Sequence, residues 1–129
     1  MPQQFHQFQV KFPIQGTISF VGRFNEKKAP IFIESLGDQS VVFYSHLELP
    51  IKHKNETVQY LYKISFLYEE FDIEGVILRN LTYGKANIQK FEGKFNIKEE
   101  QRSQLFKALN QYSIMLNKLK KQKLSTHYY

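Results

Sequence analysis

Six strand-like runs follow one another between residues 14 and 95, and the connections between them are too short to hold a crossover helix. Parallel strands need a crossover of about a dozen residues or more, whereas antiparallel strands can be joined by a tight turn. The runs are therefore expected to pair antiparallel, as a meander or a closed barrel. They are IQGTISFVG, IFIES, SVVFYS, TVQYLYKISFLYEE, FDIEGVILRNLTY and KANIQKFEGKFN.

The connections between these runs differ in kind. IFIES and SVVFYS are separated by a short stretch that contains Gly37, which predicts a hairpin. HLELPIKHKNE carries a proline and a polar cluster and is expected to be a longer loop. The two longest runs are predicted to meet near Glu70. In the first of these, alternate residues share a face that we expect to line the barrel interior: Tyr60, Tyr62, Ile64 and Phe66.

The last third of the chain changes from a strand period to a helical one. Asn96 followed by Glu99 predicts a capped helix start, and the helix is expected over residues 97–120. Such a helix is about 35 Å long, whereas a strand of six or seven residues spans about 22 Å, so it is expected to project beyond the barrel. Its apolar residues recur at spacings of four and three: Leu105, Leu109, Tyr112, Leu116 and Leu119.

Two interpretations of this apolar stripe stay open. The stripe can pack on the barrel mouth, which is favoured for the first two turns, or it can pair with the helix of a second copy. The second interpretation predicts a homodimer or partner face made of Leu109, Tyr112, Leu116 and Leu119. For the final turns the two interpretations are equally favoured.

Length and composition fit one cytoplasmic domain. The 129 residues suffice for a single core, and we divide them into an N-terminal arm (1–11), a barrel with its helix (12–120) and a basic tail expected to be disordered (121–129). Cysteine is absent, which excludes disulfides and thiol chemistry. No signal peptide and no apolar run long enough for membrane insertion is recognisable. The expected location is the cytoplasm.

The charge of the chain is basic but carried almost entirely by lysine. The net charge is +6, and only Arg23, Arg79 and Arg102 among the 18 basic residues are arginines. Such a balance suits acidic partners, single-stranded nucleic acid included, although solvated lysines more often serve solubility. The aromatic side chains needed for base stacking fall mainly in strand positions where a barrel core requires them. Nucleic-acid binding is therefore the less favoured alternative.

The segment KFEGKFNIKEEQRSQLFKAL resembles the end of the PilZ domain, in which a strand with a Gly-x-x-Phe-like step enters a helix through an acidic turn. The residues that carry the resemblance are Gly93, Phe95, Glu99, Glu100 and Arg102. It covers about residues 12–112. The resemblance implies a mainly β fold, namely a six-stranded antiparallel PilZ-like β-barrel with a long C-terminal α-helix, and a bacterial role in cyclic di-GMP signalling.

Typical PilZ domains bind cyclic di-GMP through two motifs, and both are altered here. The first, Arg-x-x-x-Arg ahead of the first strand, corresponds to QQFHQFQVKFP, which has no arginine and a single lysine, Lys11. A lysine does not reproduce the bidentate, stacked contacts of a guanidinium. A charge-assisted hydrogen bond contributes about 1.5–3 kcal/mol. Losing two arginines is thus expected to weaken binding by about 10²- to 10⁴-fold.

The second motif, Asp-x-Ser-x-x-Gly after the second strand, fits in two registers. With Ser35 in the serine slot, Ile33 replaces the acid and Asp38 replaces the glycine. With Asp38 and Ser40 in the first two slots, Phe43 replaces the glycine. The glycine is lost in either register, and a residue with a Cβ resists the conformations that glycine permits. The motif is therefore degenerate.

Other groups of polar residues predict no chemistry. His46, Glu48 and His53 lie in one loop, but their spacing matches no known metal site, so we expect no metal and no other cofactor. Glu69, Glu70 and Asp72 are expected to be a solvated hairpin end rather than an acid–base pair. No phosphate-binding loop or nucleophile motif is present in the sequence. An enzyme is not expected.

Two functions follow from this combination of features. The favoured one is a non-enzymatic adaptor that binds a protein partner in motility, pilus or biofilm signalling, with weak or absent cyclic di-GMP binding. The alternative is a cyclic di-GMP receptor with an altered site, for which the candidate ligand-binding residues are Arg23, Asp38, Ser40 and Ser35.

Overall fold

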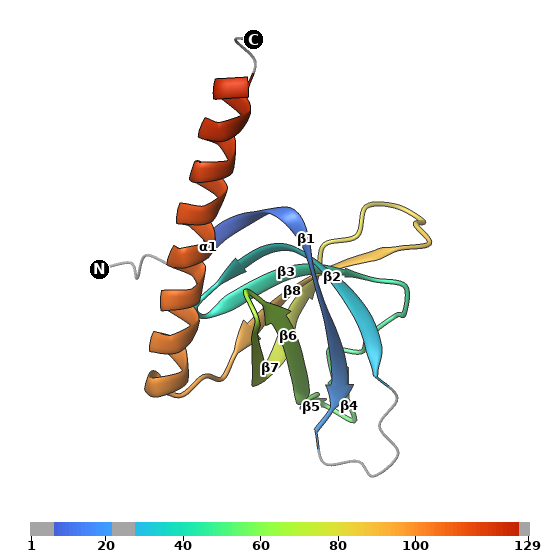
Figure 1. Cartoon of the computed structure of the whole chain (residues 1–129). Helices are drawn as coiled ribbons and strands as arrows, with labels where there is room; N and C mark the ends of the chain where they lie inside the picture. Colours follow the sequence, from blue (N-terminus) through green and yellow to red (C-terminus); the bar gives the residue numbers. More distant parts are fainter. Residues whose placement is uncertain (1–6, 22–27, 127–129) are drawn as a thin grey trace, which may run out of the picture.

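The computed structural model describes residues 7–21 and 28–126. Within these ranges the chain forms strands of very different length and one long helix, as Figure 1 shows. The strands are β1 (Gln7–Phe20), β2 (Ala29–Gly37), β3 (Ser40–Ser45), β4 (Lys52–His53), β5 (Glu56–Thr57), β6 (Tyr60–Phe66), β7 (Glu69–Asn80) and β8 (Gln89–Phe95), and the helix is α1 (Glu99–Thr126).

Six of the strands close into an antiparallel barrel in the order β1-β2-β3-β8-β7-β6. The ring is completed by two pairings between strands distant in sequence, β1 with β6 and β3 with β8. β4 and β5 form a separate two-stranded hairpin. The predicted fold class, a six-stranded antiparallel barrel followed by a C-terminal helix, is therefore confirmed.

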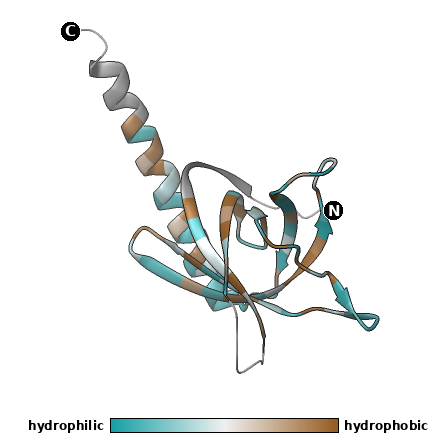
Figure 2. Cartoon of the chain, turned by 90° about the vertical axis from the view of Figure 1, so that its right-hand side faces the viewer, coloured by the Kyte–Doolittle hydropathy of each residue, from teal (hydrophilic) through white to brown (hydrophobic). Residues whose placement is uncertain are grey.

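The barrel interior is built on aromatic rings and branched aliphatic side chains. Tyr60, Tyr62, Ile64 and Phe66 are all buried, which confirms the predicted inner face of β6. The Tyr62 hydroxyl crosses the interior and donates to the carbonyl oxygen of Val76 at 3.0 Å. It passes so close to Gly93 that a Cβ there would collide with it. In Figure 2 hydrophobic and hydrophilic segments alternate along the strands, as expected when one face of each strand is buried.

α1 covers one end of the barrel with its first half and extends away from it with its second half (Figure 1). Leu105, Leu109 and Tyr112 are at most 5% exposed. The Tyr112 ring meets Phe66 edge to face, with 6.1 Å between ring centroids. Glu99 and Glu100 occupy the first turn, where negative charge complements the helix dipole.

Both ends of the barrel chain differ from the predicted boundaries. β1 begins at Gln7, so the predicted arm 1–11 overlaps a strand whose first residues pair with the end of β2. α1 continues to Thr126, so the backbone of 121–126, expected as a disordered tail, is helical. The end of α1 lies past the point where the apolar stripe fades, whereas Phe8, Val10 and Phe12 already show the alternation of a strand in the sequence.

Two connections also differ from the prediction. The expected loop 46–56 contains the hairpin β4–β5, whose turn residues Lys54 and Asn55 both have positive φ. The turn between β6 and β7 lies at Leu67 and Tyr68 rather than near Glu70. Two-residue hairpin turns with both φ values positive strongly favour asparagine and glycine. Leu67 and Tyr68 give no such signal, and the turn was therefore predicted near Glu70 instead of at these two residues.

Candidate functional site

The β2–β3 hairpin holds three of the four residues predicted to bind a ligand. Ser35 is half-buried in β2, where it pairs with Gln9 on one side and Val42 on the other. Asp38 lies in the two-residue connection and is 5% exposed. Ser40 is the half-buried first residue of β3. Arg23, the fourth candidate, lies outside the described residues.

Asp38 is held by an ion pair inside the protein. Its Oδ2 accepts a hydrogen bond from Nε of Arg102, in the first turn of α1, at 2.8 Å. The Asp38 side chain is 7% exposed and that of Arg102 is 48% exposed. The carboxylate that one motif register offers to a ligand is thus turned inward and neutralised. A shallow cavity of about 300 Å³ adjoins this pair and is also lined by Glu99, Ser103 and Phe106.

The backbone of this hairpin does not require the lost glycine. The left-handed residues of the described chain are Lys54, Asn55, Leu67, Tyr68 and Gly84, and none of them lies in the β2–β3 connection. The first residues of β1 run alongside, because Gln7 pairs with Gly37 and Gln9 with Ser35. The segment compared with the first PilZ motif therefore pairs as a strand with the β2 residues compared with the second motif.

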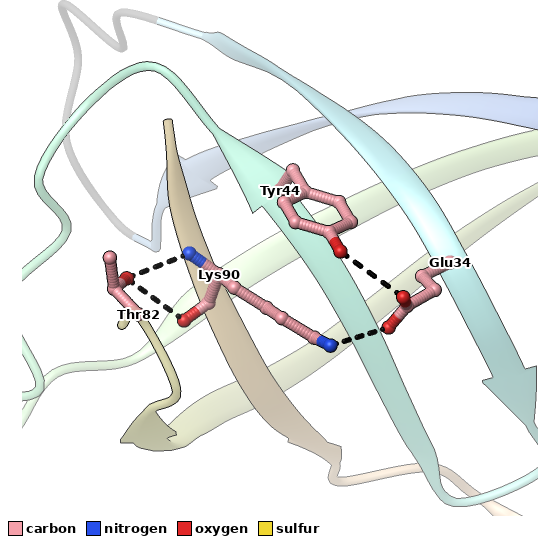
Figure 3. Close-up of polar contacts among 4 residues, drawn as sticks. All are labelled: Glu34, Tyr44, Thr82 and Lys90. Carbon is pink, nitrogen blue, oxygen red and sulfur yellow. Dashed lines mark hydrogen bonds and ion pairs between the residues drawn. The ribbon is translucent and has the colours of Figure 1, made fainter. Parts of the chain in front are cut away.

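A polar ladder lies on the outer face of the barrel next to Ser35, on strands β2, β3 and β8 (Figure 3). Glu34 accepts a hydrogen bond from the Tyr44 hydroxyl at 3.1 Å. It also forms an ion pair with Nζ of Lys90 at 3.0 Å. Lys90 also stands 5.7 Å from the centre of the Tyr44 ring. The hydrogen bond that Lys90 donates to the Glu34 carboxylate raises the pKa of Lys90. The two charges satisfy each other and leave no unpaired cation in the ladder for a phosphate.

The connection between β7 and β8 is tied to the same ladder through Thr82. The backbone N–H of Lys90 donates to Thr82 Oγ1 at 2.9 Å (Figure 3). The Thr82 backbone N–H donates to Asn80 Oδ1 at 2.8 Å. Gln89 adds further bonds, accepting from Asn80 and donating to the Ala86 carbonyl. Sequence reasoning missed both, because the ladder depends on the pairing of β3 with β8 and the Thr82 network depends on the conformation of the β7–β8 connection.

The four residues of the predicted dimer face on α1 differ in burial, since Leu109 and Tyr112 are buried and Leu119 is exposed. Leu109 and Tyr112 are 1% and 5% exposed and belong to the core of their own chain, so for them the prediction of a dimer or partner face is corrected. Leu116 is partly buried against that core. Leu119, with Met115 beside it, is more than a third exposed. The barrel-packing interpretation therefore holds for the first turns, and only the far end of the stripe remains for a second chain.

His46 lies exposed in the connection after β3. His46 meets the exposed Phe32 edge to face, with 6.2 Å between ring centroids. Within residues 7–21 and 28–126, His, Asp and Glu side chains nowhere gather in threes around a possible metal position. The described part of the chain has no helix apolar enough over a sufficient length to cross a membrane.

The fold is that of proteins with PilZ domains. The chain is similar to K. pneumonia MrkH in its apo state (10% identity, TM-score 0.65) and to the Bacillus subtilis inhibitor of motility MotI/DgrA (11% identity, TM-score 0.62). Each match covers 88% of this chain but only 52% of the other chain. This chain therefore spans about half the length of MrkH and of MotI/DgrA.

The chain is also similar to the PilZ domain of Escherichia coli YcgR, solved with c-di-GMP. This match has 9% identity and a TM-score of 0.61, and it covers 92% of this chain and 98% of that one. No protein-family model and no curated protein matches the sequence. At such low identity the likeness establishes the fold, and the chain is a PilZ-like domain.

Proposed function

We propose that this chain is a non-enzymatic, cytoplasmic PilZ-like signalling module that acts by binding another protein and has weak or no affinity for cyclic di-GMP. The observation that carries the proposal is the Asp38–Arg102 ion pair, which consumes the acid of the degenerate motif. The absence of arginine from residues 1–22 supports it. The setting in motility, pilus or biofilm signalling rests on similar folds, one of which belongs to an inhibitor of motility.

Isothermal titration calorimetry with cyclic di-GMP tests the proposal. We expect no saturable heat at micromolar dinucleotide, because the missing guanidinium contacts correspond to about 10²- to 10⁴-fold in affinity. The YcgR PilZ domain, which was solved with c-di-GMP, serves as the positive control. The variant Arg23→Ala serves as the matched variant and should titrate like the unchanged chain.

The second candidate is a cyclic di-GMP receptor with an altered site, favoured by the similar folds of YcgR and MrkH, both solved with c-di-GMP. It predicts micromolar or tighter binding that Arg23→Ala or Asp38→Ala abolishes. That result would overturn the proposal of a nucleotide-independent module. Retardation of single-stranded nucleic acid that fades with salt would instead support the less favoured nucleic-acid alternative.

A further inference from the structure

The first half of β7 has a strand on one side only. β6 pairs with β7 from Glu69 to Gly75, whereas the described pairing of β7 with β8 begins at Gly75. β8 ends at Phe95, the partner of Gly75, and the chain then enters α1 at Glu99. Residues 69–74 therefore form a strand edge within an otherwise closed barrel, and such an edge can accept a further strand.

The polar backbone groups of this edge point toward α1. The carbonyl of Glu74 accepts from the backbone N–H of Asn96 at 2.7 Å, and the carbonyl of Asp72 accepts from the Gln101 side-chain amide at 2.6 Å. In an antiparallel strand alternate residues direct their N–H and C=O groups to the same side. The backbone groups of Glu70 therefore face the same way. Gln101 occupies one position that a neighbouring strand would otherwise fill.

A groove separates this edge from the helix. Two adjoining cavities of about 490 and 400 Å³ run along it, and Gln104 of α1 lines both. Asp72 and Glu74 line the first on the strand side, and Glu69 and Glu70 line the second. Strands pair at about 4.8 Å, whereas a helix with its side chains is about 10–12 Å wide. An extended chain can hydrogen-bond to the strand edge, whereas a helix has its own backbone groups bonded internally.

The groove is acidic on a basic protein. Its lining carries five carboxylates and two ammonium groups, a balance of −3 against a net charge of +6 for the whole chain. The carboxylates are Glu69, Glu70, Asp72, Glu74 and Glu100, and the ammonium groups are Lys98 and Lys107. A segment bearing lysine or arginine is the complementary occupant.

An aromatic side chain stands at one end of the groove. Tyr68 immediately precedes the strand edge, and its side chain is fully exposed. Leu67 and Tyr68 both have positive φ, 53° and 63°. Tyrosine is among the residues that contribute most to protein–protein binding. Tyr68 is thus placed to pack on a chain that leaves the groove.

We propose that the 69–74 edge of β7 is the partner-binding site, and that it takes up an extended basic peptide segment of another protein as an added strand. The inference rests on the proposed function, since it names how that module would recognise its protein partner. Backbone hydrogen bonds to Glu70, and to Asp72 once the peptide displaces the Gln101 amide, hold the peptide, and the acidic lining selects its charge.

The test uses a short peptide that alternates lysine and valine, titrated into the full chain labelled for NMR. We expect saturable shifts at the amides of Glu70 and Asp72, together with slower hydrogen exchange there, while the β1–β2 amides stay unchanged. Blocking alternate peptide N–H groups by N-methylation should weaken binding about tenfold or more, because the added-strand bonds are lost. A glutamate–valine peptide should not bind.

Charge variants complete the test. Glu70→Lys with Asp72→Lys should weaken binding at least about tenfold. The matched control Glu56→Lys changes an exposed acid on β5, away from the groove, and should bind nearly as tightly. Equal binding of the N-methylated peptide, or no binding of the unmodified one at low salt, would overturn the inference. Cyclic di-GMP binding would instead overturn the proposed function, so the two failures are distinguishable.

Discussion

At the scale of single residues, the turn at Leu67 and Tyr68 has an unfavourable backbone conformation. Both residues adopt left-handed conformations, with φ values of 53° and 63°. An L residue with a Cβ pays about 1–2 kcal/mol there, and glycine avoids that cost. Leu67 packs against the core, whereas Tyr68 contacts solvent only. The strain at Tyr68 therefore has no compensating contact within the described chain.

Replacing Tyr68 with glycine should stabilise the fold. We expect the free energy of unfolding of Tyr68→Gly to rise by about 0.5–1 kcal/mol in urea titrations, since glycine removes more strain than it adds in unfolded-state entropy. Tyr68→Ala is the matched control, because it keeps the Cβ and should show no such gain. A glycine variant no more stable than the alanine variant would contradict the assignment of strain. The same variant should bind the lysine–valine peptide more weakly, because the aromatic contact is lost.

At the scale of elements, the far end of α1 is the part of the predicted dimer face that its own barrel does not cover. Leu116 and Leu119 continue the line of Leu105, Leu109 and Tyr112 by helical spacing. Ile114 lies about 200° around the helix from Leu116 and is also exposed. The sequence carries lysines at 118, 120, 121 and 123, and like charges on two copies oppose pairing at low salt.

A dimer through this stripe is a prediction that light scattering can check. We expect the mass of a dimer at high protein concentration and elevated salt, and the mass of a monomer for Leu116→Glu with Leu119→Glu. Ile114→Glu introduces the same charge on the opposite face and should leave the dimer intact. A monomeric mass for the unchanged chain under these conditions would remove the prediction.

The elements themselves were largely predictable, because each depends on local patterns. The inner face of β6 followed from alternation, and the apolar stripe of α1 followed from its spacing of four and three. The turn at Leu67 and Tyr68 was not predictable, since residues that disfavour a turn occupy it.

The candidate site was predictable only in part. Asp38 and Arg102 were each singled out, but their pairing joins residues 64 positions apart. The same holds for Glu34 with Lys90, which meet only because β3 pairs with β8. The open edge of β7 was hidden for a related reason, because it depends on where β8 stops pairing. Contacts between distant strands leave no periodic signal in either segment.

At the scale of the whole molecule, two buried tyrosines are expected to make the barrel less stable at alkaline pH. Burial raises the pKa of Tyr60 from 10.0 to about 12, and burial, with a smaller contribution from Tyr60, raises the pKa of Tyr62 further. Because these folded-state pKa values lie above the unfolded ones, the neutral forms stabilise the fold fully below pH 10. That stabilisation is lost as the pH rises from 10 through 12.

Urea unfolding between about pH 9 and about pH 12 measures this effect. We expect the free energy of unfolding to fall steadily above pH 10, because the unfolded chain releases tyrosine protons that the barrel retains. In Tyr60→Phe the fall should be shallower, although the variant also loses the bond from the Tyr60 hydroxyl to the Pro50 carbonyl. Equal slopes in the two proteins would show that Tyr60 is not responsible.

The pairing of β3 with β8 also bears on how the chain is made. Ser40 and Lys94 are partners in that ladder, so one edge of β3 stays unpaired during synthesis until the residues of β8 have emerged from the ribosome. Unpaired strand edges of nascent chains can pair with other chains and aggregate, because synthesis is slow relative to collision with other chains. A ribosome stalled before residue 89 would release a product prone to aggregate, whereas one stalled within the outer half of α1 would release a completed barrel.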